Sequence, residues 1–119
     1  MKYEALRKLV VDALEELKAV DITQLDIEEK SSFTNLMIVA TGTSSRHVTS
    51  LSSHVIMACK KKGVVPIGVS GERDGEWVAI DLGDIVLHVM QPQIRDYYNL
   101  EKLWEVEVAD MHEPVPKIG

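Results

Sequence analysis

Cysteine and long apolar runs are almost absent from this sequence of 119 residues. Cys59 is the only cysteine, so no disulfide can form within the chain, as is usual for proteins of the reducing cytoplasm. No apolar run approaches the roughly 20 residues that cross a bilayer, and the densest, residues 36–40, has the length of a buried strand. The N-terminal residues MKYEALRKL mix both charges, unlike a signal peptide. These absences predict a cytoplasmic globular protein without a membrane partner, and the length fits one domain.

Basic residues are scarce in the second half of the chain. Residues 72–113 hold three Lys or Arg against eleven Asp or Glu, whereas residues 1–71 hold nine against eight. An acidic region repels phosphate, so we expect little direct contact with nucleic acid there. The negative charge would attract a basic protein surface, or it would serve solubility alone. The charge by itself leaves both interpretations open.

Aromatic residues make up only 5% of the sequence, yet Trp77, Tyr97, Tyr98 and Trp104 all lie in this acidic region. Tryptophan and tyrosine are frequent anchors of protein interfaces, and an acidic rim around them would select a basic partner. The competing interpretation is that Trp77 and one tyrosine complete the hydrophobic core. We do not expect all of these residues to lie in the core, because the region is short and heavily charged.

The spacing of apolar residues predicts an α/β domain in which one mixed β-sheet of about five strands is packed with helices. Residues 2–19 and a segment from Ser44 or Ser45 to Lys62 repeat at helical spacing. A strand, the second helix and the apolar run 64–69 suggest a right-handed βαβ unit, in which a proline places the last strand at an edge or a bulge. The other expected elements are strands at residues 25–28, 35–41, 77–81 and 85–90, a helix from Pro92 to about Trp104, and an extended tail at residues 105–119.

Three patterns raise the question of a catalytic or ligand site. The loop 42–48 (GTSSRHV) leads from a strand into a helix and could hold a phosphate, but it lacks a Walker or dinucleotide fingerprint and equally suits a capped helix. The histidines lack the short spacing of metal ligands. Asp81 and Asp84 could bind magnesium for nucleotidyl transfer, yet they stand three apart across a turn, where Asp84 could instead bond local amides. We therefore predict no catalytic residue, no cofactor and no metal.

The motifs GTSSRHV at residues 42–48, DLGD at 81–84, HVM at 88–90 and YNLEKLW at 98–104 stand in the order and spacing of one known family. Along residues 1–104 the chain resembles the ribosomal silencing factors, also called the Iojap-like family. This resemblance implies one family domain at residues 1–104, with the tail outside it. It also implies a fold similar to that of nucleotidyltransferases, without their catalytic carboxylates.

The resemblance further implies a function without catalysis. Such proteins bind a basic protein of the large ribosomal subunit, the fourteenth in the standard naming, and sterically block association of the large and small subunits. Translation is thereby repressed. The resemblance also implies a homodimer when the protein is free of the ribosome. The implied contacts are carboxylates for lysine or arginine, aromatic anchors, and a glycine that lets a turn approach closely. The residues in these positions are Trp77, Asp81, Leu82, Gly83, Asp84, Tyr98, Glu101, Leu103 and Trp104.

Overall fold

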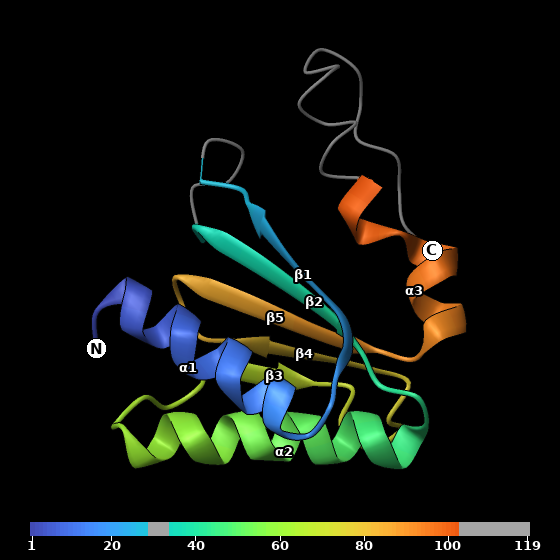
Figure 1. Cartoon of the computed structure of the whole chain (residues 1–119), viewed down its shortest axis with the longest axis horizontal. Coiled ribbons are helices and arrows are strands. Elements are labelled where there is room, and N and C mark those ends of the chain that lie inside the picture. Colours follow the sequence, from blue (N-terminus) through green and yellow to red (C-terminus); the bar gives the residue numbers. More distant parts are fainter. Residues whose placement is uncertain (29–33, 103–119) are drawn as a thin grey trace.

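The computed structural model describes residues 1–28 and 34–102. Three helices and five strands follow one another along this part of the chain, as Figure 1 shows. They are α1 (Tyr3–Glu16), β1 (Val20–Asp26), β2 (Leu36–Thr41), α2 (Ser45–Lys61), β3 (Gly68–Ser70), β4 (Trp77–Asp81), β5 (Ile85–Met90) and α3 (Pro92–Tyr98). Among the helices of these residues, none is both long enough and apolar enough to cross a membrane.

The five strands form one sheet in the order β1-β2-β5-β4-β3. Strands β2 and β5 run parallel in the centre, and the other neighbouring pairs are antiparallel. All six residues of β2 are buried, because layers cover the sheet on both sides of this strand. The predicted α/β fold, with a mixed sheet of about five strands packed with helices, is confirmed.

The hydrophobic core has two parts, one on each face of the sheet. Helices α1 and α2 pack against one face and form the larger part, while α3 lies against one end of the other face (Figure 1). The helix α1 contributes Leu6, Val10, Ala13 and Leu14, whose spacing of three and four places them on one side. The smaller part surrounds Met37, Val39 and Met90, and α3 packs onto it. The candidate site described below lies on this second face and at the turn between β4 and β5.

The predicted strand over residues 64–69 is wrong in its extent. Strand β3 holds only three residues, pairs antiparallel with β4, and is separated from β2 by two other strands. It runs in the same direction as β2 in the same sheet, as the predicted βαβ unit requires, and β5 and β4 lie between the two strands. Its position at an edge of the sheet is as Pro66 predicted, because a residue without an amide hydrogen is tolerated there.

The first helix and the first strand differ at their shared boundary from the prediction. Helix α1 ends at Glu16, before the predicted residue 19, because Lys18 adopts φ +59°. The Ala19 N–H then donates to the Leu14 carbonyl, which closes the helix as a Schellman motif without a glycine. With the turn completed this early, β1 begins at residue 20 and not at 25.

The last helix is shorter than predicted. Helix α3 ends at Tyr98 because Asn99 adopts φ +47°, the left-handed conformation that ends many helices. The Asn99 Oδ1 atom accepts a hydrogen bond from the Lys102 N–H at 3.3 Å, so asparagine also caps a new helical turn that starts at Leu100. The predicted end at Trp104, and the boundary between domain and tail at residue 105, lie outside the described residues.

Candidate functional site

The turn between β4 and β5, residues 81–84, holds two carboxylates in different roles. We call it the acidic turn. Asp81 Oδ1 accepts the Gly83 N–H at 2.9 Å, so this side chain shapes the turn. The Asp84 side chain is exposed, while its carbonyl accepts the amides of Asn35 and Leu36 at 3.0 and 3.1 Å. Within residues 1–28 and 34–102, the side chain that bonds an amide of the turn is that of Asp81, and not that of Asp84 as the sequence suggested.

The two residues between these carboxylates serve the fold of the turn. Leu82 is only 7% exposed and belongs to the larger part of the core, so its side chain is unavailable to a partner. Gly83 adopts φ +90°, a conformation that residues with a side chain rarely take. A Cβ atom at this position would meet only Ile67 Cδ1, at an ordinary 3.6 Å, so the need for glycine is conformational.

The predicted contacts Trp77 and Tyr98 lie together in an aromatic cluster, which we define as Trp77, His88, Tyr97 and Tyr98. The rings of Trp77 and Tyr98 lie 4.8 Å apart between their centroids, and Tyr97 stands edge-on to Tyr98 at 4.9 Å. Trp77 and Tyr98 are half-buried and pack against the smaller part of the core, whereas Tyr97 is 79% exposed. The two half-buried rings thus complete a core cluster and still present part of their surface.

His88 fixes the orientation of Trp77. The indole N–H of Trp77 donates to His88 Nδ1 at 2.9 Å, which requires an unprotonated nitrogen there. Burial lowers the pKa of His88 from 6.5 to about 4, so the ring is neutral at pH 7 and accepts this bond. The tryptophan is thereby held in one orientation at the start of β4.

Arg95 ties α3 to the edge of the sheet. Its guanidinium donates to Glu101 Oε1, Thr41 Oγ1 and Thr23 Oγ1, each at 2.8 Å, and also to the Asp21 carbonyl. The Arg95 side chain is only 11% exposed and Glu101 is 27% exposed. Glu101, predicted to meet a basic partner, is therefore already paired within the chain, and it positions α3 and its tyrosines.

The acidic turn and the aromatic cluster lie at opposite ends of β4. Trp77 begins this strand and Asp81 ends it, so a rise of roughly 3.3 Å per residue separates them by about 13 Å. In Figure 1 the turn lies at the left end of β4 and β5, and α3 lies at the right. The structure thus brings Trp77 together with Tyr98, but it does not bring either of them to the turn. The predicted contacts Leu103 and Trp104 lie outside the described residues.

The loop 42–48 is accounted for by local structure. Ser44 Oγ accepts the His47 N–H at 3.1 Å and caps α2, so the interpretation as a capped helix is confirmed. A Cβ atom at Gly42 would lie 2.7 Å from Val48 Cγ2, which explains the glycine. His47 joins the helices, since its Nε2 lies 2.8 Å from the Leu17 carbonyl. Within residues 1–28 and 34–102, no cluster of three or more His, Cys, Asp or Glu could hold a metal ion.

Two residues that shape the site were missed by reasoning from the sequence. For His88 a signal existed, since the alternation of a strand places residues 88 and 90 on one face of β5. In the sheet Met90 pairs with Trp77, so His88 lies on the face that carries the tryptophan. For Arg95 no local signal existed. Apart from Glu101, its partners come from β1 and from the end of β2, and only the folded sheet brings them within reach.

This fold is shared with solved structures. A crystal structure of a Chromobacterium violaceum protein superimposes with a TM-score of 0.86 at 40% identity, covering 100% of this chain and 93% of that chain. The chain is thus a member of a known class of small α/β domains with a mixed sheet.

The sequence comparisons define the family. Residues 1–118 match the family model described as "Ribosomal silencing factor during starvation". Proteins named ribosomal silencing factor RsfS are 45% identical over 104 residues in Chromobacterium violaceum and 42% identical over 100 residues in Haemophilus influenzae. The matches cover 87% of this chain and 85% of the first relative, and 84% of this chain and 98% of the second. The chain belongs to the ribosomal silencing factor family, and this membership implies a ribosome-associated role in silencing translation.

Proposed function

We propose that this protein silences ribosomes by obstruction and without catalysis. It binds the basic fourteenth protein of the large ribosomal subunit through the acidic turn and the aromatic cluster. Bound there, in the cytoplasm, it occupies space that the small subunit needs and prevents the two subunits from joining. Family membership supports the ribosomal role, and the chemistry of the surface supports the kind of partner.

The observation that carries the proposal is the exposed carboxylate of Asp84 on a turn with a fixed shape. Asp81 and Gly83 hold the turn through the 2.9 Å hydrogen bond, so little conformational freedom is lost when a partner binds. An exposed carboxylate favours lysine or arginine, and complementary charge speeds association and selects the partner. Because one oxygen of Asp81 is occupied by the turn, a magnesium-binding pair of carboxylates is less well supported than a protein contact.

A single partner can reach both ends of β4. A standard protein interface buries roughly 800 Å² on each side, which spans well over the roughly 13 Å between the turn and the cluster. Trp77 and Tyr98 would then serve as anchors, held by His88 and by α3. The exposed Tyr97 is a further candidate contact, whereas buried Leu82 and internally paired Glu101 serve the shape of the surface.

Co-sedimentation with separated ribosomal subunits tests the proposal. We expect the wild-type protein to travel with large subunits and not with small ones. Asp84→Lys should weaken this binding by about thirtyfold, corresponding to roughly 2 kcal/mol for the loss of an anchor that also repels a basic partner. The matched control is Asp74→Lys, which makes the same charge change at an exposed position of the loop before β4. Equal affinity of the two variants would refute the acidic turn as a contact.

Two related expectations stay predictions. Trp104→Ala should weaken large-subunit binding if the residues after 102 extend the surface, and the same sedimentation assay measures this. A homodimer of the free protein is also expected, and sedimentation equilibrium in the absence of ribosomes would detect it.

A further inference from the structure

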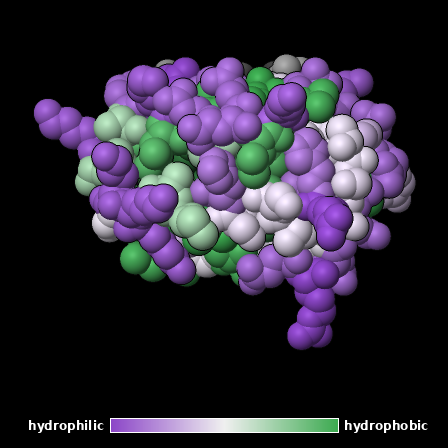
Figure 2. Space-filling view, turned by 60° about the horizontal axis from the view of Figure 1, so that its bottom comes forward, coloured by the Kyte–Doolittle hydropathy of each residue, from purple (hydrophilic) through white to green (hydrophobic). Residues whose placement is uncertain are grey.

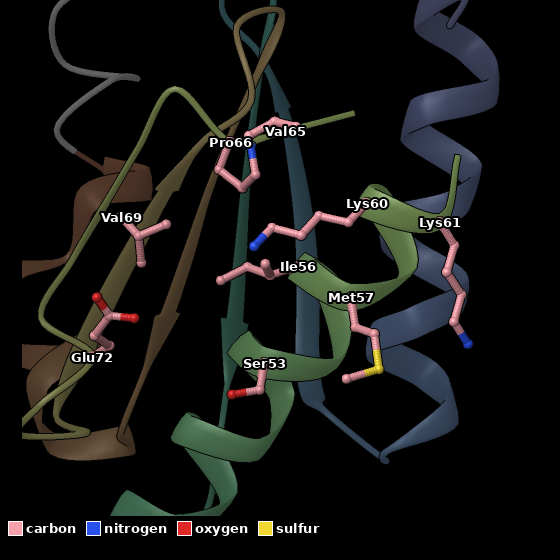
Figure 3. Close-up of a pocket in the computed structure, with 9 residues that line it drawn as sticks. All are labelled: Ser53, Ile56, Met57, Lys60, Lys61, Val65, Pro66, Val69 and Glu72. Carbon is pink, nitrogen blue, oxygen red and sulfur yellow. The ribbon is translucent and has the colours of Figure 1, made fainter. Parts of the chain in front are cut away.

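A groove runs between the C-terminal half of α2 and the segment that leads into β3 (Figure 3). Ile56 and Met57 of α2 line one side, and Val65, Pro66 and Val69 line the other. The groove has a volume of about 690 Å³ and is open to solvent. It is built from parts of the chain that the acidic turn and the aromatic cluster do not use.

Exposed apolar side chains gather around this groove. Met57 and Val65, which line the groove, are 58% and 68% exposed. Figure 2 brings the α2 side forward and shows apolar atoms concentrated on the left, where the C-terminal half of α2 lies in Figure 1. Exposed apolar side chains add nothing to the stability of the core, and a cluster of them marks a contact site.

The strand beside the groove has a free edge. Strand β3 is the last strand of the sheet, so the backbone groups on its outer side are unpaired within the described residues. A free edge next to an apolar groove is the geometry in which proteins bind extended peptides, because the backbone supplies hydrogen bonds and the groove receives alternate side chains.

The charge around the groove selects an acidic occupant. Lys60 and Lys61 line it, Lys62 follows, and none of the three forms a salt bridge within the part of the chain that the structure describes. In Figure 3 the Lys60 side chain extends from α2 toward Pro66. Glu72 is the only carboxylate among the lining residues, so positive charge prevails. A nucleic acid would also meet these lysines, but its phosphates would gain nothing from the apolar walls, which favours a peptide.

We propose that this groove binds an extended, apolar and acidic peptide segment of a partner protein, added as a further strand along the free edge of β3. Its apolar side chains lie against Ile56, Val65 and Val69, and its carboxylates meet Lys60 and Lys61. The acidic turn suits a basic partner, so the two surfaces select partners of opposite charge. The protein could therefore join a second protein to the one it contacts through the turn.

Selection from a random decapeptide display library on the purified full-length chain tests this proposal without ribosomes. We expect enrichment of peptides in which apolar residues alternate with Asp or Glu. Fluorescence anisotropy then measures the affinity of one enriched peptide for variants of exposed residues. Val65→Asp and the double variant Lys60→Glu with Lys61→Glu should each weaken binding at least tenfold. The controls, Val20→Asp on the opposite edge strand and Lys2→Glu, should bind as the wild type does.

A second measurement tests the strand-like mode of binding. Methylation of alternate backbone nitrogens of the peptide should abolish binding in one register and spare it in the other, because only one set of amides faces β3. The proposal is overturned if no acidic peptide is enriched, or if Val65→Asp binds the enriched peptide as the wild type does. If an RNA oligonucleotide of random sequence displaces the peptide, the lysines bind phosphate groups and not the carboxylates of a peptide. A lower mass of Val65→Asp than of wild type in light scattering would assign the groove to a second copy.

Discussion

Removing Arg95 should destabilise the protein far more than removing an exposed arginine. Arg95→Met keeps the aliphatic part of the side chain but deletes three hydrogen bonds of 2.8 Å to side chains and one to the Asp21 carbonyl. Thr41 is only 5% exposed, so its hydroxyl loses a hydrogen-bond donor that water cannot easily replace. Glu101 loses its ion pair.

The size of the effect follows from these contacts. Breaking a buried pair by removing one partner typically costs about 3–5 kcal/mol. Because Glu101 is 27% exposed and regains some hydration, we expect the lower end, about 3 kcal/mol in the free energy of unfolding. Urea unfolding followed by far-ultraviolet circular dichroism measures this value. Amide hydrogen exchange should also speed up in α3, since the helix loses the contacts that tie it to β1 and β2.

Arg7→Met provides the matched control. Arg7 is 40% exposed, its salt-bridge partner Glu4 is 75% exposed at 3.8 Å, and its hydrogen bond to the Gln24 side chain also lies at the surface, so we expect a change within about 0.5 kcal/mol. A value for Arg95→Met as small as this would refute the anchoring role of Arg95. Unchanged exchange rates in α3 would refute it as well.

Three further predictions concern stability. Folding lowers the pKa of His88 from 6.5 to about 4, so the neutral ring stabilises the folded state fully above pH 6.5. Between pH 6.5 and 4 the free energy of unfolding should therefore fall by about 3 kcal/mol. Urea unfolding across this range should show a flatter pH profile for His88→Gln. Gly71→Ala should cost about 3 kcal/mol or more, since Gly71 has φ +82° and a Cβ atom would meet the Trp77 carbonyl oxygen, whereas Gly68→Ala should change thermal stability little. Ser44→Ala should cost about 1 kcal/mol in the same thermal assay, because α2 loses its cap.

Much of the fold could be predicted because local signals agreed with it. The apolar run of β2, the serine cap of α2 and the two strands around the acidic turn all appear in the sequence at their true places. What failed was decided by geometry that the sequence does not display. Lys18 ends α1 in the left-handed conformation, which lysine rarely adopts, so no residue type announced that end. Asn99 ends α3 in the same conformation, which asparagine tolerates better than most residues, but the helical pattern was continued past it. The apolar run 64–69 predicted a longer strand, but only residues 68–70 pair with β4.

In the candidate site, too, some features could be predicted from the sequence and others could not. The motifs identified the family and the residues of the turn, but not which side chains face solvent. Leu82 and Asp84 lie two residues apart, yet one is buried and the other is exposed, because Leu82 packs into the core as the chain leaves β4. The pairing of Glu101 with Arg95 joins residues six positions apart across the end of α3, and helical spacing alone does not predict it.

The most direct test of the central claim is a subunit-joining assay. Purified large subunits are incubated with increasing amounts of the protein, small subunits are added under joining conditions, and assembled ribosomes are quantified by sucrose-gradient sedimentation. We predict a dose-dependent loss of assembled ribosomes with wild type and with Asp74→Lys, and a loss that requires about thirtyfold more protein with Asp84→Lys. Undiminished joining at concentrations of wild type that saturate the large subunit would contradict obstruction as the mechanism.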